Sequence, residues 1–144
     1  MIISAQLSHL DEIVAIENSS FEKPWSRKQI KDDIQANINS ENWVFTLDRK
    51  VVGYIFGWIA QNEFHLHKIA VHPDHLRKKI GKQLIQHIIS KVVDQKVNVI
   101  LLEVSINNIS ARKCYQSLGF VKGGVLKDYY SKGDDAILYN LEIN

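Results

Sequence analysis

An apolar strand, a basic turn and an amphipathic helix follow one another between residues 69 and 83, and this order constrains the fold more than any other stretch. The segment reads IAVHPDHLRKKIGKQ, so that an apolar run enters His-Pro-Asp and then a turn of cations that contains Gly81. Apolar side chains then recur at helical spacing, at Ile80, Leu84, Ile88 and Val92. The segment therefore predicts a strand–turn–helix unit in which the basic turn lies at the N-terminus of the helix.

The N-terminus of this helix is expected to bind phosphate groups. Its first backbone N–H groups have no partner within the helix, and the helix dipole adds partial positive charge at the same point. The cationic side chains around it are Arg77, Lys78, Lys79 and Lys82. A polyphosphate is the ligand that such a turn favours, although a basic turn by itself is more often a solvated loop.

Length and charge limit the class of protein. A chain of 144 residues most simply forms one domain over residues 1–144, with room for a real core. No apolar run approaches the roughly 18 residues of a membrane span, and the first residues lack the features of a signal peptide. We therefore expect a cytoplasmic protein that does not bind membranes. A net charge of +2 is too small to indicate direct nucleic-acid binding, and Cys114, the single cysteine, excludes an internal disulfide.

Hydrophobic periodicity predicts seven strands and four helices, in the order β-α-α-β-β-β-α-β-α-β-β. The expected strands cover residues 1–7, 43–47, 51–60, 64–71, 97–104, 120–130 and 136–143. Ser8 and Ser26 are expected to cap the first two helices. The run 97–104 is apolar except for Glu103, as expected for a strand that is buried on both faces. This order predicts an α/β sandwich built on a mixed sheet.

The motifs VHPDHLRKKIGK and NNISARKCYQSLGF, at this separation and within this element order, resemble those of the GCN5-related N-acetyltransferases, the GNAT superfamily. The resemblance covers essentially the whole chain. It implies the GNAT acyl-CoA N-acyltransferase fold, with a mixed central sheet of about seven strands and helices on both faces. The segments IENSSFEKPWS, LLEV and KDYY…DDAILYNL further resemble the bacterial ribosomal-protein alanine N-acetyltransferases of RimI type.

The resemblance implies acetyl-CoA as the acyl donor. The pantetheine arm is expected to hydrogen-bond to the backbone at the end of the fourth strand, and the pyrophosphate to lie on the basic turn. The residues so implied in cofactor binding are Ile69, Ala70, Val71, Arg77, Lys78, Lys79, Ile80, Gly81, Lys82 and Asn108. Glu103 matches the general base of the family and Tyr115 its general acid. No metal is expected, because the histidine pairs 65/67 and 72/75 lack carboxylate or cysteine partners at ligand spacing.

The basic turn departs from the family pattern, which usually has Gln or Arg, two residues, Gly, one residue, and then Gly or Ala. Here Leu76 occupies the first position and Lys79 the first glycine position, so Gly81 alone remains. If the Lys79 position needs left-handed backbone geometry, a residue other than glycine costs about 1–2 kcal/mol there. Ser105 stands where the RimI type often has Arg.

Acetyl transfer to an amine requires a neutral amine and a protonated leaving thiolate. An α-amine has a reference pKa of about 7.7–8.0 and lysine about 10.4, so at pH 7 the neutral fraction of the α-amine is roughly a few hundredfold larger. With the resemblance, this favours the N-terminal α-amine of a protein, best an alanine-starting small-subunit ribosomal protein. Glu103 would accept the amine's proton directly or through one water, and Tyr115 would protonate the thiolate.

Other functions stay open from the sequence alone. A small amine, such as a polyamine or an aminoglycoside, would suit an acceptor groove rich in carboxylates. The carboxylates that could line such a groove are Glu22, Asp32, Asp33 and Asp128. A non-catalytic acetyl-CoA-binding module would fit the altered glycine turn. Glu103 could also be a capped surface carboxylate and Tyr115 a core residue, and the sequence does not indicate the oligomeric state.

The acceptor groove is expected between the loop 21–25 and the late strands around Tyr129 and Tyr130. Phe21 and Trp25 either shape this groove or pin the first two helices to the sheet. Because neighbouring residues of a strand point to opposite faces, one of the two tyrosines should face the core and the other the acceptor.

Overall fold

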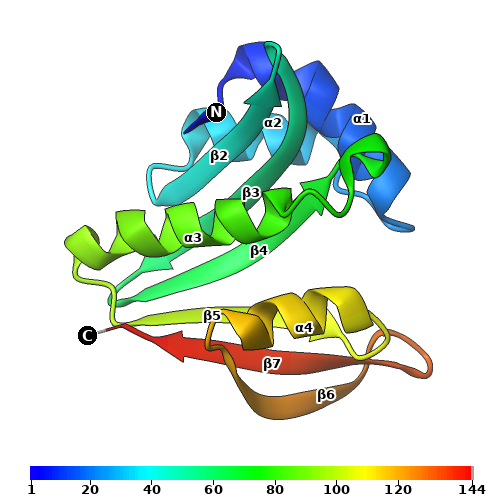
Figure 1. Cartoon of the computed structure of the whole chain (residues 1–144), viewed down its shortest axis with the longest axis vertical. Coiled ribbons are helices and arrows are strands. Elements are labelled where there is room, and N and C mark those ends of the chain that lie inside the picture. The colour runs from blue at the N-terminus through cyan, green and yellow to red at the C-terminus, as the bar shows by residue number, and fades with distance from the viewer. Residues whose placement is uncertain (144) are drawn as a thin grey trace.

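The computed structural model describes residues 1–143, which contain seven strands and four α-helices (Figure 1). The strands are β1 (Ile2–Ser4), β2 (Ser40–Leu47), β3 (Lys50–Ala60), β4 (Glu63–Val71), β5 (Val99–Ser105), β6 (Val121–Ser131) and β7 (Asp134–Glu142). The helices are α1 (Leu10–Ser20), α2 (Arg27–Ala36), α3 (Ile80–Val92) and α4 (Ile109–Ser117). Short 3₁₀ turns at Leu7–His9, Pro73–His75 and Val93–Gln95 join these elements. The predicted α/β class and element order are confirmed.

Within this described range the seven strands form a single mixed sheet, in the order β1-β2-β3-β4-β5-β7-β6. Neighbouring strands are antiparallel except for β4 and β5, which run parallel. That parallel pairing joins only Glu63–Leu66 to Val99–Leu102. Beyond these residues β4 and β5 separate, and Figure 1 shows the two strands diverging. The sheet is therefore split at its centre over the second half of β4.

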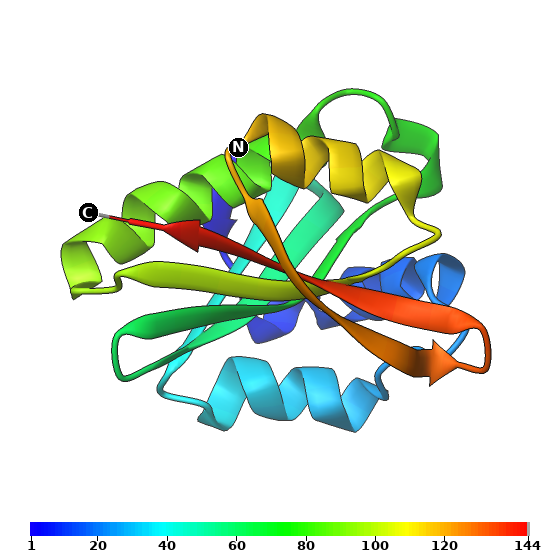
Figure 2. The same cartoon turned by 90° about the horizontal axis from the view of Figure 1, so that it is seen from below.

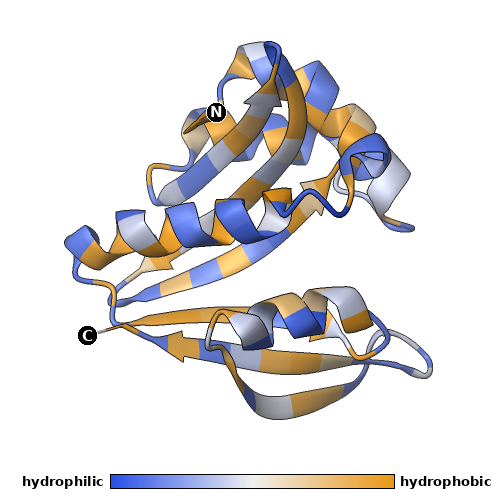
Figure 3. Ribbon diagram, viewed as in Figure 1, coloured by the Kyte–Doolittle hydropathy of each residue, from blue (hydrophilic) through white to orange (hydrophobic). Residues whose placement is uncertain are grey.

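Helices cover both faces of the sheet, as predicted. Figure 2 shows α3 and α4 on one side and α1 and α2 on the other. Apolar residues recur between polar ones along α3 (Figure 3), and its buried side chains Leu84, Ile85 and Ile88 join the core on that side. The opposite core contains Ile13 and Ile16 of α1 together with neighbouring strand residues. None of the helices in residues 1–143 is long and apolar enough to span a membrane.

The expectation that the run 97–104 is buried on both faces is wrong. Burial alternates along β5, where Ile100, Leu102 and Val104 are buried and the residues between them are only half-buried. The reason is that α1 packs on β3 and β4, and α2 on β2, so that these helices do not cover the same face of β5. This uncovered face carries Glu103.

The predicted N-cap of α2 is confirmed, whereas the predicted N-cap of α1 is wrong. Ser26 caps α2, because its Oγ accepts a hydrogen bond from the backbone N–H of Gln29 at 3.1 Å. Ser8 does not cap α1, since it lies inside the 3₁₀ turn Leu7–His9. In that turn the backbone N–H of Gln6 donates to Nδ1 of His9 at 3.0 Å.

Strand β4 carries one extra residue opposite Gly57 of β3. Phe56 pairs with Lys68 while Gly57 pairs with Leu66, so His67 forms a β-bulge at the point where β4 leaves β5. The strands approach closely here. A Cβ atom on residue 57 would lie 2.1 Å from Cζ of Phe64 and 2.7 Å from the backbone oxygen of His65. Glycine at this position therefore permits the bulge.

Replacing Gly57 by alanine should lower the free energy of unfolding by about 1–3 kcal/mol or more, because the added methyl overpacks a buried site. Urea unfolding measures this change. Gly81→Ala is the matched control, since its methyl would lie no closer than 3.9 Å to Cγ2 of Val71. Equal stabilities of the two variants would contradict this account of the bulge.

Candidate active site

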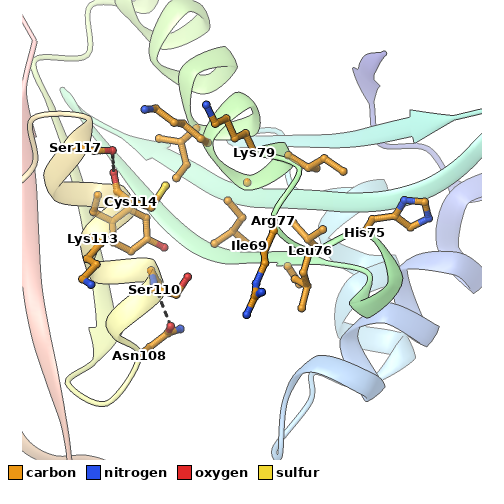
Figure 4. Close-up of a pocket in the computed structure, with 18 residues that line it drawn as sticks. Ile69, His75, Leu76, Arg77, Lys79, Asn108, Ser110, Lys113, Cys114 and Ser117 are labelled. Carbon is orange, nitrogen blue, oxygen red and sulfur yellow. Dashed lines mark hydrogen bonds between the residues drawn. The ribbon is translucent and has the colours of Figure 1, made fainter.

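A cavity of about 510 Å³ lies between the end of β4, the basic turn, the start of α3, and α4 (Figure 4). The predicted cofactor residues that line it are Ile69, Ala70, Val71, Arg77, Lys79, Ile80, Gly81, Lys82 and Asn108. Lys78 is not among the lining residues, and its Nζ lies 3.4 Å from Nδ1 of His75 instead. The structure thus brings together the strand end and the helix start that the sequence connected.

The backbone at the end of β4 is paired on one side only. Ile69, Ala70 and Val71 pair with β3, whereas the ladder to β5 has already ended at Leu66. Among the described residues no strand occupies the β5 side of these three, and they face the cavity. An extended ligand could therefore hydrogen-bond to this edge in the manner of an added strand.

The basic turn reaches α3 through left-handed backbone geometry. Arg77 has a φ of 65° and Lys79 a φ of 61°, and Lys79 is the N-cap of α3 without a side-chain cap bond. The first helical bond runs from the N–H of Gln83 to the oxygen of Lys79 at 3.1 Å. The N–H groups of residues 80–82 have no hydrogen-bond partner among residues 1–143, and these residues line the cavity. The position of Lys79 thus needs left-handed backbone geometry, and a lysine there costs about 1–2 kcal/mol of backbone strain.

Helix α4 supplies the opposite wall of the cavity. Oδ1 of Asn108 accepts a hydrogen bond from the N–H of Ala111 at 3.2 Å, so that it caps this helix. Tyr115 lines the cavity while being only 4% exposed. Burial raises the pKa of the Tyr115 hydroxyl well above its usual range, and nearby Cys114 and Tyr130 add to the effect. Tyr115 therefore keeps its proton at neutral pH.

Several lining residues were not predicted to bind the cofactor. They are His75, Leu76, Ile85, Ser110, Ala111, Lys113, Cys114 and Ser117. Most of them lie on α4 at spacings of three or four residues, so helical periodicity from Asn108 would have found them. Burial raises the pKa of the Cys114 thiol while Lys82 lowers it, and the net rise disfavours Cys114 as a nucleophile.

Glu103 lies on the other face of the sheet and does not line the cavity. Its Oε2 is 2.6 Å from Nε2 of His65 on β4, and its side chain is 22% exposed. Burial, and then the Glu103 carboxylate, raise the pKa of Tyr130 of β6 to about 12. Tyr129 and Tyr130 are both exposed, so the expectation that one of them faces the core is wrong. The reason is that β6 is the edge strand of the sheet.

The loop 21–25 is held against the sheet by Glu17 of α1, a residue that no sequence pattern marked. The Glu17 carboxylate is 1% exposed and accepts hydrogen bonds from the N–H of Trp25 at 2.8 Å and from the hydroxyl of Tyr54. Nζ of Lys68 lies 2.9 Å from the same carboxylate and 3.7 Å from the ring centroid of Phe21. These contacts favour pinning as the role of the loop. The sequence feature that could have indicated this contact is Lys68, a charged residue within β4 that needs a partner when buried.

A cluster of rings lies between this loop and Glu103. The rings of His65 and His67 are 4.5 Å apart, Trp58 is 4.5 Å from His67, and Trp25 is 6.4 Å from it. Burial, and then the charge of His65, lower the pKa of His67. Trp25 therefore both pins the loop and borders this face.

No group of three or more His, Cys, Asp or Glu in the described part of the chain is arranged to hold a metal ion.

Lys79→Gly should raise the free energy of unfolding by up to about 1.5 kcal/mol. It relieves about 1–2 kcal/mol of left-handed strain and adds about 0.5–1 kcal/mol of chain entropy cost. Lys78→Gly is the control, because Lys78 does not have a positive φ and gains no such relief. Urea unfolding compares the two variants, and calorimetry should show that Lys79→Gly still binds acetyl-CoA. Equal destabilisation of both variants would contradict the claim that the backbone is strained at Lys79.

The chain is similar to known acetyltransferases over most of its length. The acetyltransferase (GNAT) family matches residues 10–120. The ribosomal protein bS18-alanine N-acetyltransferase of Escherichia coli (strain K12) is 30% identical, over 99% of this chain and 97% of the relative.

Solved structures have the same fold. The crystal structure of the ribosomal-protein-S18-alanine N-acetyltransferase from Escherichia coli matches with a TM-score of 0.92 and 28% identity, over 100% of this chain and 94% of that chain. A structure from Salmonella typhimurium with its cofactor acetyl-CoA matches with a TM-score of 0.88 and 16% identity, over 100% and 94% of the two chains.

Proposed function

This chain belongs to the acetyltransferase (GNAT) family and is an N-acetyltransferase, and we propose that it acetylates the N-terminal α-amine of a protein with acetyl-CoA. The best candidate acceptor is an alanine-starting small-subunit ribosomal protein. The Escherichia coli relative supports this acceptor, because it is named as an N-acetyltransferase of alanine in ribosomal protein bS18. Such a substrate would be met in the cytoplasm, the location expected from the sequence.

The observation that best supports the proposal is the separation of β4 from β5 beyond Leu66 and Leu102. The opening between the two strands joins two faces of the sheet that differ in chemistry. On one face lies a cavity with free backbone groups at Ile69–Val71 and a cationic helix start. On the other face lies the carboxylate of Glu103. A donor held on the first face and an amine held on the second would meet where the strands separate.

The cavity fits acetyl-CoA on its own chemistry. The half-paired edge of β4 would hold the amide-containing pantetheine arm, and the N–H groups of residues 80–82 with Arg77, Lys79 and Lys82 would hold the pyrophosphate. Asn108 and α4 would close the other side. When bound, acetyl-CoA supplies the acetyl group as a thioester.

Glu103 and Tyr115 are the proposed proton-transfer groups. Glu103 accepts the proton of the acceptor amine, directly or through one water, and its partial exposure leaves room for either route. Tyr115 lines the cavity and stays protonated because burial raises its pKa, so its hydroxyl can donate to the leaving sulfur. No covalent enzyme intermediate is needed.

The positions of the carboxylates disfavour a polycationic acceptor. Asp33 is buried and accepts hydrogen bonds from Trp58 and Asn42, while Asp32 pairs with Lys28 at 2.7 Å. Asp128 lies on β6, where its Oδ1 accepts from the N–H of Gly133 at 2.7 Å. Asp32 and Asp33 lie on α2 and Asp128 on β6, and each of the three is engaged locally, so they do not form the anionic groove that a polyamine or aminoglycoside would need.

Thiol release from acetyl-CoA should be fast with an alanine-starting peptide and slow with the same peptide after N-terminal acetylation, or with spermidine. The difference arises because only the free α-amine is both neutral enough and matched to the proposed site. Faster turnover with spermidine would favour the small-amine reading. Acetyl-CoA binding without turnover of either acceptor would favour the non-catalytic module.

In the same assay, Glu103→Gln should reduce kcat by about 10²–10⁴-fold, the usual range for a general base. The loss should be largest at low pH, where more of the acceptor amine carries a proton that must be removed. Glu142→Gln, near the end of β7, is a matched change of an exposed carboxylate outside the site. A ratio of mutant to wild-type rates that does not vary with pH would contradict the assignment of Glu103 as base.

A further inference from the structure

His65 makes the one close polar contact that reaches from β4 to the Glu103 side chain in the described residues. The ladder between β4 and β5 ends at Leu66 and Leu102, and Glu103 is the next residue along β5. Nε2 of His65 lies 2.6 Å from Oε2 of Glu103, which is hydrogen-bonding distance. This side-chain contact therefore spans the two strands where their backbone pairing stops.

We propose that His65 is a positioning residue that fixes the Glu103 carboxylate and passes its proton to solvent. The proposal rests on the function proposed above, in which Glu103 is the base. His65 does not touch the acceptor in this scheme and acts through Glu103 alone.

The proton transfers balance without any further reactant. The acceptor's N–H bond breaks as an O–H bond forms on the Glu103 carboxylate. That O–H bond then breaks as Nε2 of the neutral His65 ring, whose own proton is on Nδ1, takes the proton, which leaves a carboxylate beside an imidazolium whose Nε2–H donates to Oε2. The imidazolium loses its Nδ1 proton to water while Nε2–H still donates to the Glu103 carboxylate, and proton exchange of the exposed ring with water restores the Nδ1–H tautomer before the next transfer. Glu103 is thereby ready for the next amine, and no oxidation or reduction takes place.

Exposure decides which group can deliver the proton to water. The His65 side chain is 40% exposed and that of Glu103 is 22% exposed, so the histidine is the more open partner. Nε2 of His67 is buried and has no hydrogen-bond partner within residues 1–143. His67 therefore contributes its ring to the packing and offers no exit for a proton.

Titratable groups from four elements surround His65. The titratable groups that face this cluster are Glu103 from β5, His67 from β4, Asp33 from α2 and Tyr130 from β6. Burial lowers the pKa of His67, so that ring remains neutral when His65 gains a proton. The Glu103 carboxylate, whose Oε2 lies 2.6 Å from Nε2 of His65, is in direct contact with that ring and attracts the positive charge that the ring carries during the proton transfer.

The test compares His65→Gln, His65→Ala and Glu103→Gln in steady-state kinetics with an alanine-starting peptide, from about pH 6 to about pH 9. Glutamine keeps an N–H donor near the place of Nε2 but cannot take up a proton. His65→Gln should retain both KM values and lose kcat at least about tenfold, with the acid limb of the pH profile changed. His87→Gln on α3, whose ring packs on Trp43, is the matched control and should match wild type.

Rescue separates proton transfer from a structural role. His65→Ala should be slower than His65→Gln, and added imidazole should restore its rate in proportion to the concentration of the neutral form. Wild-type kcat and pH profile in His65→Gln would overturn the proposal, as would a slow, folded His65→Ala that imidazole does not restore. Urea unfolding and acetyl-CoA binding establish that each variant is folded.

The same data distinguish the role of Glu103 as base from the role of His65 as its positioning residue. A slow Glu103→Gln beside a normal His65→Gln would leave Glu103 as base and remove the role of His65. Wild-type rates in Glu103→Gln would remove the base assignment, and the inference about His65 would fail with it.

Discussion

The arrangement of the site depends on one feature of the sheet, the early end of the parallel pairing between β4 and β5. In an ordinary parallel pair the whole of β4 would be hydrogen-bonded on both sides. Here pairing stops at Leu66 and Leu102, which leaves the backbone of Ile69–Val71 half-paired at the cavity wall. The bulge at His67, which Gly57 permits, begins at the same place. One irregularity of the backbone thus creates both the ligand-facing edge and the passage between two faces.

The two sides of this opening are built by different interactions. On the side of α3 and α4, backbone conformation dominates, because the left-handed residues Arg77 and Lys79 present free N–H groups at the helix start. On the side of α1 and α2, buried charge dominates, because the Glu17 carboxylate joins Lys68, Tyr54 and the loop 21–25. Removing one partner of a buried ion pair typically costs about 3–5 kcal/mol. The second side is therefore held rigidly although it has few helical contacts near β5.

Local patterns accounted for the parts of the structure that local physics determines. Helical spacing, the Ser26 cap and the basic turn before α3 are properties of neighbouring residues, and the element order followed from them. The bulge at His67 and the Glu17 cluster could not be read in this way, because they join residues on separate elements. The burial of β5 was predicted wrongly for a related reason. An apolar run does not reveal how far a helix from elsewhere in the chain extends over it.

The candidate site divides along the same line. The lining of the cavity was largely predictable, since Ile69–Val71 and residues 79–82 belong to one segment of the sequence, and Asn108 and Tyr115 lie at the N-cap of α4 and within this helix. The contact between His65 and Glu103 was not, because the resemblance assigned a role to Glu103 and none to the histidines. Only the diagonal placement of these side chains on β4 and β5 brings Nε2 and Oε2 to 2.6 Å.

The most direct measurement is a crystal structure with coenzyme A joined through an acetyl link to the N-terminus of an alanine-starting peptide. We expect the diphosphate to lie at residues 80–82, the link to pass between the diverging ends of β4 and β5, and the peptide to lie on the face of Glu103. A conjugate bound wholly on one face of the sheet, or with its diphosphate away from the start of α3, would contradict it.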